Sequence, residues 1–398
     1  MIINKAFKFR LYPDETQKVL LAQHFGSCWF IYNTFLRERI DFFAINKGTE
    51  KQRLTYADTS RMMTDMKKQP DREWLKDVNS QSLQQSLRRL DVAYNNFFNK
   101  RARFPKFKSK HGKQSFSVHQ HFKIDVEQGL LNIPKFPPIK TVFHHPIEGK
   151  MKSVNISQAT SGKYFAAILC EVEKEVKQKQ GGGEIGLDLD LKSLVVTSDD
   201  EAIPAPKFFH TSQVKLARLQ RLLSRKVKGS NNRNKAHVKV ARIHEKITNQ
   251  RNDFLHKLSN WLVSENQTIY AEDLNVKGMT ANHCLAKSVV DASWSEFVHQ
   301  IKYKSKWNGV LFGQIDRFFP SSKRCNACCW INQSLTLADR EWTCQECGVV
   351  VDRDRNAAQN ILQFGQLSMV RRDASEPPKR PGRPRAVRQV ADLGSRLL

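Results

Sequence analysis

The sequence has no long apolar segment. No stretch approaches the roughly 18 consecutive apolar residues of a transmembrane helix, and the N-terminal MIINKAFKFR lacks the apolar core of a signal peptide. Acidic residues are scarce beside basic ones, because 39 Asp and Glu stand against 66 Lys and Arg. These shortages argue against membrane insertion and secretion, and we expect a cytoplasmic protein.

Cysteine is sparse and unevenly placed. Of the eight cysteines, Cys28, Cys170 and Cys284 stand alone, and four others form two C-x-x-C pairs near the C-terminus. Such a distribution does not suit a disulfide framework and indicates a reducing compartment. We interpret the three isolated cysteines as small buried apolar residues.

Positive charge is what the chain has in excess. The net charge of +27 points to a polyanion partner, because Lys and Arg neutralise phosphates and release their counterions. The segment that ends in RARFPKFKSK combines basic residues with Phe104 and Phe107, as a phosphate track with stacking surfaces would. A merely basic soluble protein and a membrane-surface protein are the rival interpretations.

The 398 residues exceed the usual size of a single core and suggest two or three structural units. A strand pattern ends at Pro13, helical periodicity follows from Asp14, and period-two alternation over 115–176 includes a hairpin turned at Ser161-Gly162. The glycine-rich residues 177–183 resemble a flexible linker and mark the main predicted boundary.

Carboxylates occur at three positions where a core segment would not normally hold them. Asp188 interrupts the apolar strand pattern IGLDLDL, Glu272 ends the apolar run Thr268–Ala271, and Asp354 adjoins a predicted helix. Burying an unpaired charge is costly unless a cation compensates it. We therefore expect these acids to meet around Mg²⁺, with Asp188 shared by two ions and the other two acids each completing one site; such a pair of ions suits phosphodiester hydrolysis.

The strongest local motif is a pair of C-x-x-C knuckles separated by fifteen residues. This spacing predicts a closed, structural zinc ribbon whose tetrahedral thiolate ligands are Cys325, Cys328, Cys344 and Cys347. Cys329 stands at a knuckle position where glycine is common, and we interpret it as a bystander. A redox-active C-x-x-C is the rival reading.

The motifs along the chain, taken in their order, resemble those of the TnpB family of transposon-encoded RNA-guided DNA endonucleases, which are related to type V CRISPR effectors. The resemblance covers nearly the whole chain. It rests on KFRLYPDETQ, WFIYNTFL, RFPKFKSK, GLDLDLKSL, RIHEKITNQRNDFLHKLS, AEDLNVKGM, SVVDASWSEFVHQIKYKSKW, FFPSSKRCNAC, LADREWTCQECG and DRDRNAAQNI.

The resemblance implies an α/β plus β architecture in which a wedge β-barrel with an inserted helical recognition domain precedes an RNase H-like (RuvC) nuclease interrupted by the zinc ribbon. The expected ranges are wedge barrel 1–13 and 111–176, recognition domain 14–110, linker 177–183, nuclease 184–320 and 349–365, zinc ribbon 321–348 and a basic, disordered tail 366–398.

The resemblance also implies site residues and partners. The catalytic acids correspond to Asp188, Glu272 and Asp354, with two catalytic Mg²⁺, and Arg340 matches an arginine near the active site of relatives. A guide RNA from the transposon end would direct the protein, associated with the nucleoid, to double-stranded target DNA beside a short target-adjacent motif. Contacts to that motif are expected from Tyr56, Ser60, Ser80, Gln81 and Gln84.

Two features depart from the family pattern or stand outside it. The first acid motif usually reads G-I-D-L-G, and Asp190 replaces its second glycine, which places an extra carboxylate near Asp188. The tail contains KRPGRPR, which resembles a minor-groove AT-hook core, although so short a pattern is weak and a generic basic tail is the favoured interpretation.

Other functional classes make different demands. A strand-transferring transposase could share the acid cluster but would not need guide RNA, and a zinc-ribbon transcription factor leaves the acids unexplained. An RNA-guided DNA-binding regulator with weak or absent nuclease activity is the main alternative, although such relatives usually lose a catalytic acid.

Overall fold

The computed structural model describes residues 1–48, 53–110, 112–336 and 338–374. The chain forms two compact units, one of residues 1–177 with 208–255 and one of residues 178–207 with 256–398. The main break falls within the predicted linker 177–183. Among the described helices, none combines the length and apolarity that spanning a membrane requires.

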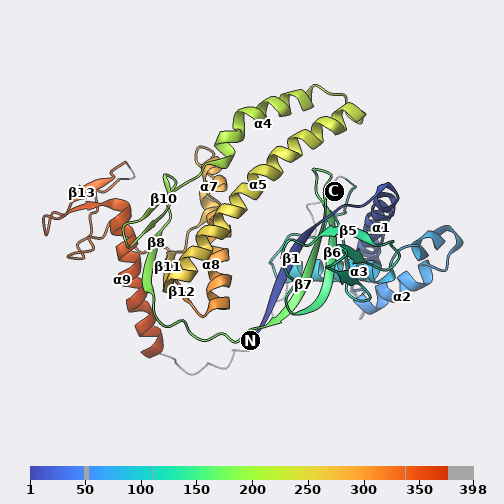
Figure 1. The fold of residues 1–398 in the computed structure, drawn as a ribbon, viewed down its shortest axis with the longest axis horizontal. Helices are drawn as coiled ribbons and strands as arrows, with labels where there is room; N and C mark the ends of the chain where they lie inside the picture. The colour runs from blue at the N-terminus through green and yellow to red at the C-terminus, as the bar shows by residue number, and fades with distance from the viewer. Residues whose placement is uncertain (49–52, 111, 337, 375–398) are drawn as a thin grey trace. The chain divides into compact units, whose positions relative to one another are not determined.

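The first unit contains an antiparallel sheet with the order β2-β6-β7-β1-β5-β4-β3 (Figure 1). Its strands are β1 (Ile2–Leu11), β2 (Gln114–Val118), β3 (Lys123–Asp125), β4 (Leu130–Asn132), β5 (Ile139–Val142), β6 (Lys150–Gln158) and β7 (Tyr164–Glu173). The expected hairpin is confirmed, because β6 and β7 pair and Gly162 takes a left-handed φ of 85° in their turn.

The sheet is a curled half-barrel, where we expected a wedge β-barrel. In the described chain β2 and β3 stand at opposite edges of the strand order and share no ladder. Both edge strands are short, at five and three residues, and therefore offer few backbone groups for closure.

Three helices and a 3₁₀ segment complete the part of this unit that precedes the linker. They are α1 (Glu15–Ile45), α2 (Tyr56–Met66), η1 (Pro70–Lys76) and α3 (Ser80–Phe98). Asp14 begins α1 with a capping box, since its carboxylate accepts the amide of Gln17 and the Gln17 side chain accepts the amide of Asp14. One apolar core joins helices and sheet and includes Phe9, Phe25 and Phe116.

A helical hairpin, α4 (Phe208–Ser224) and α5 (Asn231–Glu265), follows in the chain. Arg233 closes the turn by donating to the carbonyl oxygens of Leu223 at 3.1 Å and Lys226 at 2.8 Å. The first part of α5 groups with the first unit, and its last turns group with the second.

The second unit contains a five-stranded sheet with the order β10-β9-β8-β11-β12. The strands are β8 (Gly183–Asp188), β9 (Ser193–Thr197), β10 (Ala202–Pro204), β11 (Asn266–Glu272) and β12 (Leu311–Ile315). Strands β8, β11 and β12 run parallel, whereas β9 and β10 are antiparallel additions. The carboxyl ends of the three parallel strands therefore meet at one edge.

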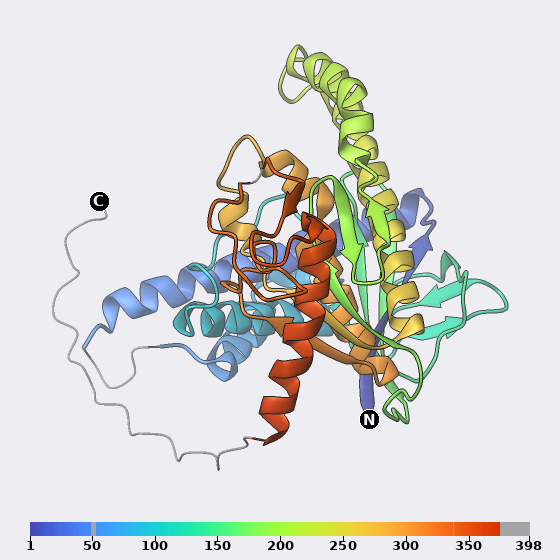
Figure 2. The same cartoon turned by 90° about the vertical axis from the view of Figure 1, so that its left-hand side faces the viewer.

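Helices cover both faces of this sheet. The connections supply α6 (Val276–Met279), α7 (Ala286–Ala292) and α8 (Trp294–Asn308). The last helix, α9 (Arg353–Ala374), packs on one face, and α8 with the end of α5 lies on the other (Figures 1 and 2). Because α9 continues to Ala374, residues 366–374 are helical, whereas we expected disorder from 366; residues 375–398, with KRPGRPR, lie outside the described chain.

Two glycines allow α9 to approach the sheet closely. A Cβ at Gly186 of β8 would overlap the carbonyl oxygen of Ala358, and a Cβ at Gly365 of α9 would overlap the ring of Tyr270 on β11. The helix backbone therefore lies where an ordinary side chain would stand. This contact fixes the N-terminal turn of α9 relative to the end of β8.

Candidate nuclease site and zinc cluster

The three predicted acids lie at one edge of the five-stranded sheet. Asp188 is the last residue of β8 and Glu272 is the last residue of the neighbouring strand β11. Asp354 stands in the first turn of α9, which begins one residue after β14 (Val350–Asp352). Asp352 caps that helix, since its carboxylate accepts the amides of Asp354 and Arg355 at 3.1 and 2.9 Å.

The acids line one cavity of about 440 Å³. Its other walls come from Leu189 and Asp190 after β8, from the loop after β12, from the segment between the zinc knuckles and from the start of α9. The residues in these walls are Leu189, Asp190, Ser322, Lys323, Leu335, Thr336 and Arg353. Asp190, the departure from the family motif, thus shares the cavity with Asp188.

The cavity concentrates negative charge in a poorly solvated place. Burial raises the pKa of Asp188 well above its usual range, and the carboxylates of Glu272, Asp354 and Asp190 raise it further, while Arg353 opposes the rise. Burial also raises the pKa of Glu272, against the hydrogen bond that it accepts from Ser321. The ionised forms of Asp188 and Glu272 are therefore disfavoured unless a cation binds beside them.

Three partners hold the carboxylates in place. The Ser321 hydroxyl donates to Glu272 Oε1 at 2.6 Å, and Arg353 donates to Asp354 Oδ1 at 2.9 Å. Arg340 donates to Asp354 Oδ2 at 2.9 Å and lies 3.6 Å from the Asp190 carboxylate. Arg340 is the arginine that the family resemblance implies near the site, whereas no local pattern in the sequence indicates Ser321 or Arg353.

The donor set suits magnesium. Four carboxylates that line one cavity supply hard oxygen ligands, and a divalent cation bound there would offset their mutual repulsion. The Arg340 side chain, which pairs with Asp354, is 44% exposed and therefore accessible to solvent.

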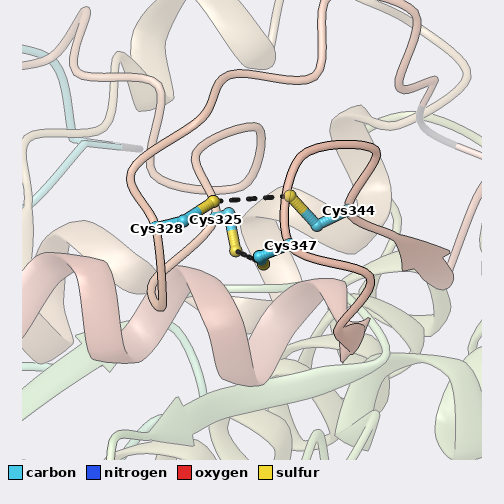
Figure 3. A group of neighbouring side chains, drawn as sticks. All are labelled: Cys325, Cys328, Cys344 and Cys347. Carbon is cyan, nitrogen blue, oxygen red and sulfur yellow. Dashed lines mark hydrogen bonds between the residues drawn. The ribbon is translucent and has the colours of Figure 1, made fainter.

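The four knuckle cysteines form a second site, at which their sulfur atoms all lie within 4.8 Å of one another (Figure 3). The Sγ atoms of Cys325 and Cys347 are 3.8 Å apart and those of Cys328 and Cys344 are 3.5 Å apart. A tetrahedron with Zn–S bonds near 2.3 Å has sulfur separations of about 3.8 Å. The cluster fits a structural zinc ion, as the spacing predicts.

The two knuckles have the same backbone geometry. The amides of Cys329 and Gly348 donate to the carbonyl oxygens of Cys325 and Cys344, each at 2.9 Å, and their φ angles are 69° and 73°. Cys329 therefore occupies a left-handed position that favours glycine. Its exposed thiol accepts from Arg324 at 2.7 Å and lies outside the four-sulfur cluster.

Between the knuckles, the chain passes the carboxylate cavity. Leu335 and Thr336 line that cavity, and Arg340 precedes β13 (Glu341–Thr343), which pairs with β14 just before α9. Asp339 accepts the amide and hydroxyl of Thr336 at 2.8 Å. The cysteine cluster thus anchors a wall of the acidic site.

The five residues expected to contact a target-adjacent motif lie on two helices of the first unit. Tyr56 and Ser60 are on α2, and Ser80, Gln81 and Gln84 are on α3. Ser80 and Gln84 are exposed, whereas the Gln81 side chain is bonded to Gln120, and Arg88 lies over the Tyr56 ring. The role of these five residues in recognising bases stays a prediction.

Three family models match the chain. One described as "Probable transposase" covers residues 167–283, a Cas12f1-like TNB domain model covers 294–361, and a helix-turn-helix model covers 1–47. In this structure, residues 1–47 form β1 and the single long helix α1. The class is therefore that of transposase-related proteins with a Cas12f1-like C-terminal domain.

Similarity to curated relatives extends over almost the whole chain. A Streptomyces pristinaespiralis protein is 38% identical over 96% of this chain and 94% of its own length, and InsQ of Escherichia coli K12 is 34% identical over 91% and 92%. Both names propose an RNA-guided DNA endonuclease. The chain belongs to the TnpB family.

A solved structure agrees on the fold. The Cas12f1 protein in a complex with its guide RNA and target DNA matches 90% of this chain and 98% of its own chain, with a TM-score of 0.55 and 13% identity. At that identity, the match shows a type V effector fold and no more.

Proposed function

We propose that this protein is a transposon's RNA-guided DNA endonuclease with a RuvC-like site. The observation that carries the proposal is the convergence of Asp188, Glu272 and Asp354, from two strand ends and a helix start, on one cavity of a TnpB-family chain. The names of the relatives support the same activity.

Asp188, Glu272 and Asp354 are the residues that would hold two Mg²⁺. Bound there, the ions would supply a nucleophilic water and charge relief for phosphodiester hydrolysis. Ser321 fixes the orientation of Glu272, and Arg353 restrains Asp354. Arg340, which is partly exposed beside Asp354, is suited to a phosphate oxygen once its pair with Asp354 opens.

The polyanions would be a guide RNA from the transposon end and double-stranded target DNA. A net charge of +27 matches such partners. Sequence choice would come from guide pairing, while Tyr56, Ser60, Ser80, Gln81 and Gln84 would read the target-adjacent motif.

The test is Mg²⁺-dependent cleavage of a plasmid that carries a guide-matched target beside a randomised flank, with protein copurified with its transposon-end RNA. We expect cleavage enriched at one flank, lost in Asp188→Ala, and retained in Glu184→Ala, which removes an acid from the other end of the same strand. Cleavage by Asp188→Ala, or activity without RNA, would contradict the proposal.

An RNA-guided DNA-binding regulator is the second candidate. Asp190 favours it, because this carboxylate stands where the family motif has glycine and lies 3.6 Å from Arg340. A regulator would bind the target tightly with RNA and cut it weakly, and Asp190→Gly would raise the cleavage rate. Equal rates for Asp190→Gly and the wild type would remove this candidate's support.

A further inference from the structure

Phe318 is an apolar ring that the fold places in solvent. Its side chain is 89% exposed, the highest value among the large apolar residues of the described chain. The next residue, Phe319, turns inward and stacks on Phe364 with 4.1 Å between ring centres. The loop therefore buries one of two adjacent aromatic rings and presents the other.

The loop that carries Phe318 is tied on both sides to the end of β11. Before the ring, Arg317 donates to the Asp273 carboxylate at 2.6 Å and to the Asp273 carbonyl oxygen at 3.0 Å. After the ring, Ser321 donates to Glu272 at 2.6 Å. Glu272 and Asp273 are consecutive, so both anchors end at the tip of the strand that supplies a proposed metal ligand.

The backbone of Phe318 is also held by hydrogen bonds. Its amide donates to the Asp316 carboxylate at 2.8 Å, and the Phe319 amide donates to the Asp316 carbonyl oxygen at 3.2 Å. Asp316 follows Ile315, the partner of Glu272 in the parallel ladder. Phe318 thus projects from a tight turn at the sheet edge that carries the carboxylates.

An exposed aromatic ring on a loop whose following residues line the carboxylate cavity suits one ligand class. Bases of single-stranded nucleic acid stack on such rings without sequence preference, whereas duplex bases are already stacked on each other. Lys323, which follows in the same loop and lines the cavity, supplies positive charge for the backbone. We propose that Phe318 is a stacking platform that positions a base of the unpaired DNA strand entering the carboxylate site.

This inference rests on the proposed nuclease function and goes beyond it, because it assigns a positioning residue outside the metal-ligand set. The ring contributes no chemistry to hydrolysis. It would hold one nucleotide so that a neighbouring phosphate lies over the acids, and its loss would therefore weaken strand binding and slow cleavage together.

The experiment compares single-turnover cleavage of a target duplex by the full RNA-loaded protein with Phe318 changed to Ala, Leu or Trp. Loss of one stacked base corresponds to a decrease of about 5- to 150-fold, which we expect for Phe318→Ala and Phe318→Leu. Phe318→Trp should stay within about threefold of the wild type, because it retains an aromatic face. Leu367→Ala, which removes an exposed apolar side chain more than three turns along α9, is the control and should cut normally.

A binding readout separates this inference from the proposed function. In the Asp188→Ala protein, a target carrying 2-aminopurine at successive positions should change fluorescence at one or two adjacent nucleotides when Phe318→Ala is added. Normal cutting by Phe318→Leu, or an unchanged fluorescence profile, would overturn the inference while leaving the nuclease intact. Equal losses of guide-RNA affinity and cleavage in Phe318→Ala would assign the ring to RNA and also overturn it. If the wild type itself does not cut, the fluorescence profile still decides the point.

Discussion

Adding one methyl group at Gly186 should damage the nuclease site without touching any carboxylate. Gly186 lies two residues before Asp188 on β8, directly against α9, whose first turn carries Asp354. In Gly186→Ala, the new Cβ would overlap the Ala358 carbonyl oxygen and lie 2.7 Å from the Leu362 amide nitrogen. Both obstacles are backbone atoms, which cannot rotate away.

The size of the effect follows from how far α9 and β8 must move apart to accommodate the new Cβ. Ordinary contact begins near 3.4 Å, and the Ala358 carbonyl oxygen is the nearest obstacle, so helix and strand must separate by more than about 1 Å. Overpacking of this kind costs about 1–3 kcal/mol of folding free energy. A displacement near 1 Å between catalytic groups can reduce a rate about 100-fold, and we expect a 10- to 100-fold loss of cleavage.

The assay is single-turnover cleavage with saturating Mg²⁺, together with thermal unfolding of the same protein. Gly183→Ala on the same strand is the matched control, since its new Cβ would meet only the Asn266 side chain, at 3.4 Å. Gly183→Ala should cut normally. Gly186→Ala with wild-type rate and stability would refute the argument that this contact sets the spacing between Asp188 and Asp354.

Three further predictions concern the same unit. The pKa of Asp188 is raised in the folded state, so this residue stabilises the metal-free protein at pH values below the ordinary carboxyl pKa, and that contribution is lost as the pH rises through the raised pKa. The melting temperature of Asp188→Asn should therefore exceed that of the wild type by an amount that grows with pH. A pH-independent difference between the two melting temperatures would count against this prediction. Cys329→Gly should stabilise the zinc-loaded protein by about 1 kcal/mol in thermal unfolding by relieving a left-handed φ, whereas Gly348→Ala, at the equivalent position, should destabilise it by a similar amount. Removal of zinc with a zinc-selective chelator in excess Mg²⁺ should slow cleavage at least about 10-fold, because the segment at Leu335 walls the cavity; full activity without zinc would show that this wall is dispensable.

Much of the acidic site could be predicted from local patterns. An apolar run that ends in a carboxylate indicates a strand tip, as at Glu272, and a carboxylate that interrupts an apolar strand pattern indicates a site residue, as at Asp188. In the structure both residues end their strands. The knuckle spacing likewise predicts the sulfur cluster, because two short loops can bring four thiolates together only in a compact arrangement. In each case the decisive information lies within a few residues.

The remaining features depend on contacts between distant segments. Nothing near Ser321 indicates that its hydroxyl would bond to Glu272, which is 49 residues away. In the sequence, Gly186 is an ordinary small residue of a predicted strand, and only the packing of α9 against it shows why glycine is needed. Whether the first sheet closes into a barrel depends on how far its short edge strands curl, which alternation in the sequence does not record.

The order of the elements in the chain also has a consequence for biosynthesis. Asp188 and Asp354 are separated by 166 residues, and α9, which carries Asp354, is the last described element to leave the ribosome. Until that helix docks, one face of the second sheet lacks its cover, and only two of the three carboxylates are present. A nascent or prematurely terminated chain therefore cannot assemble the proposed catalytic site, which delays any cutting activity until translation has passed the zinc knuckles.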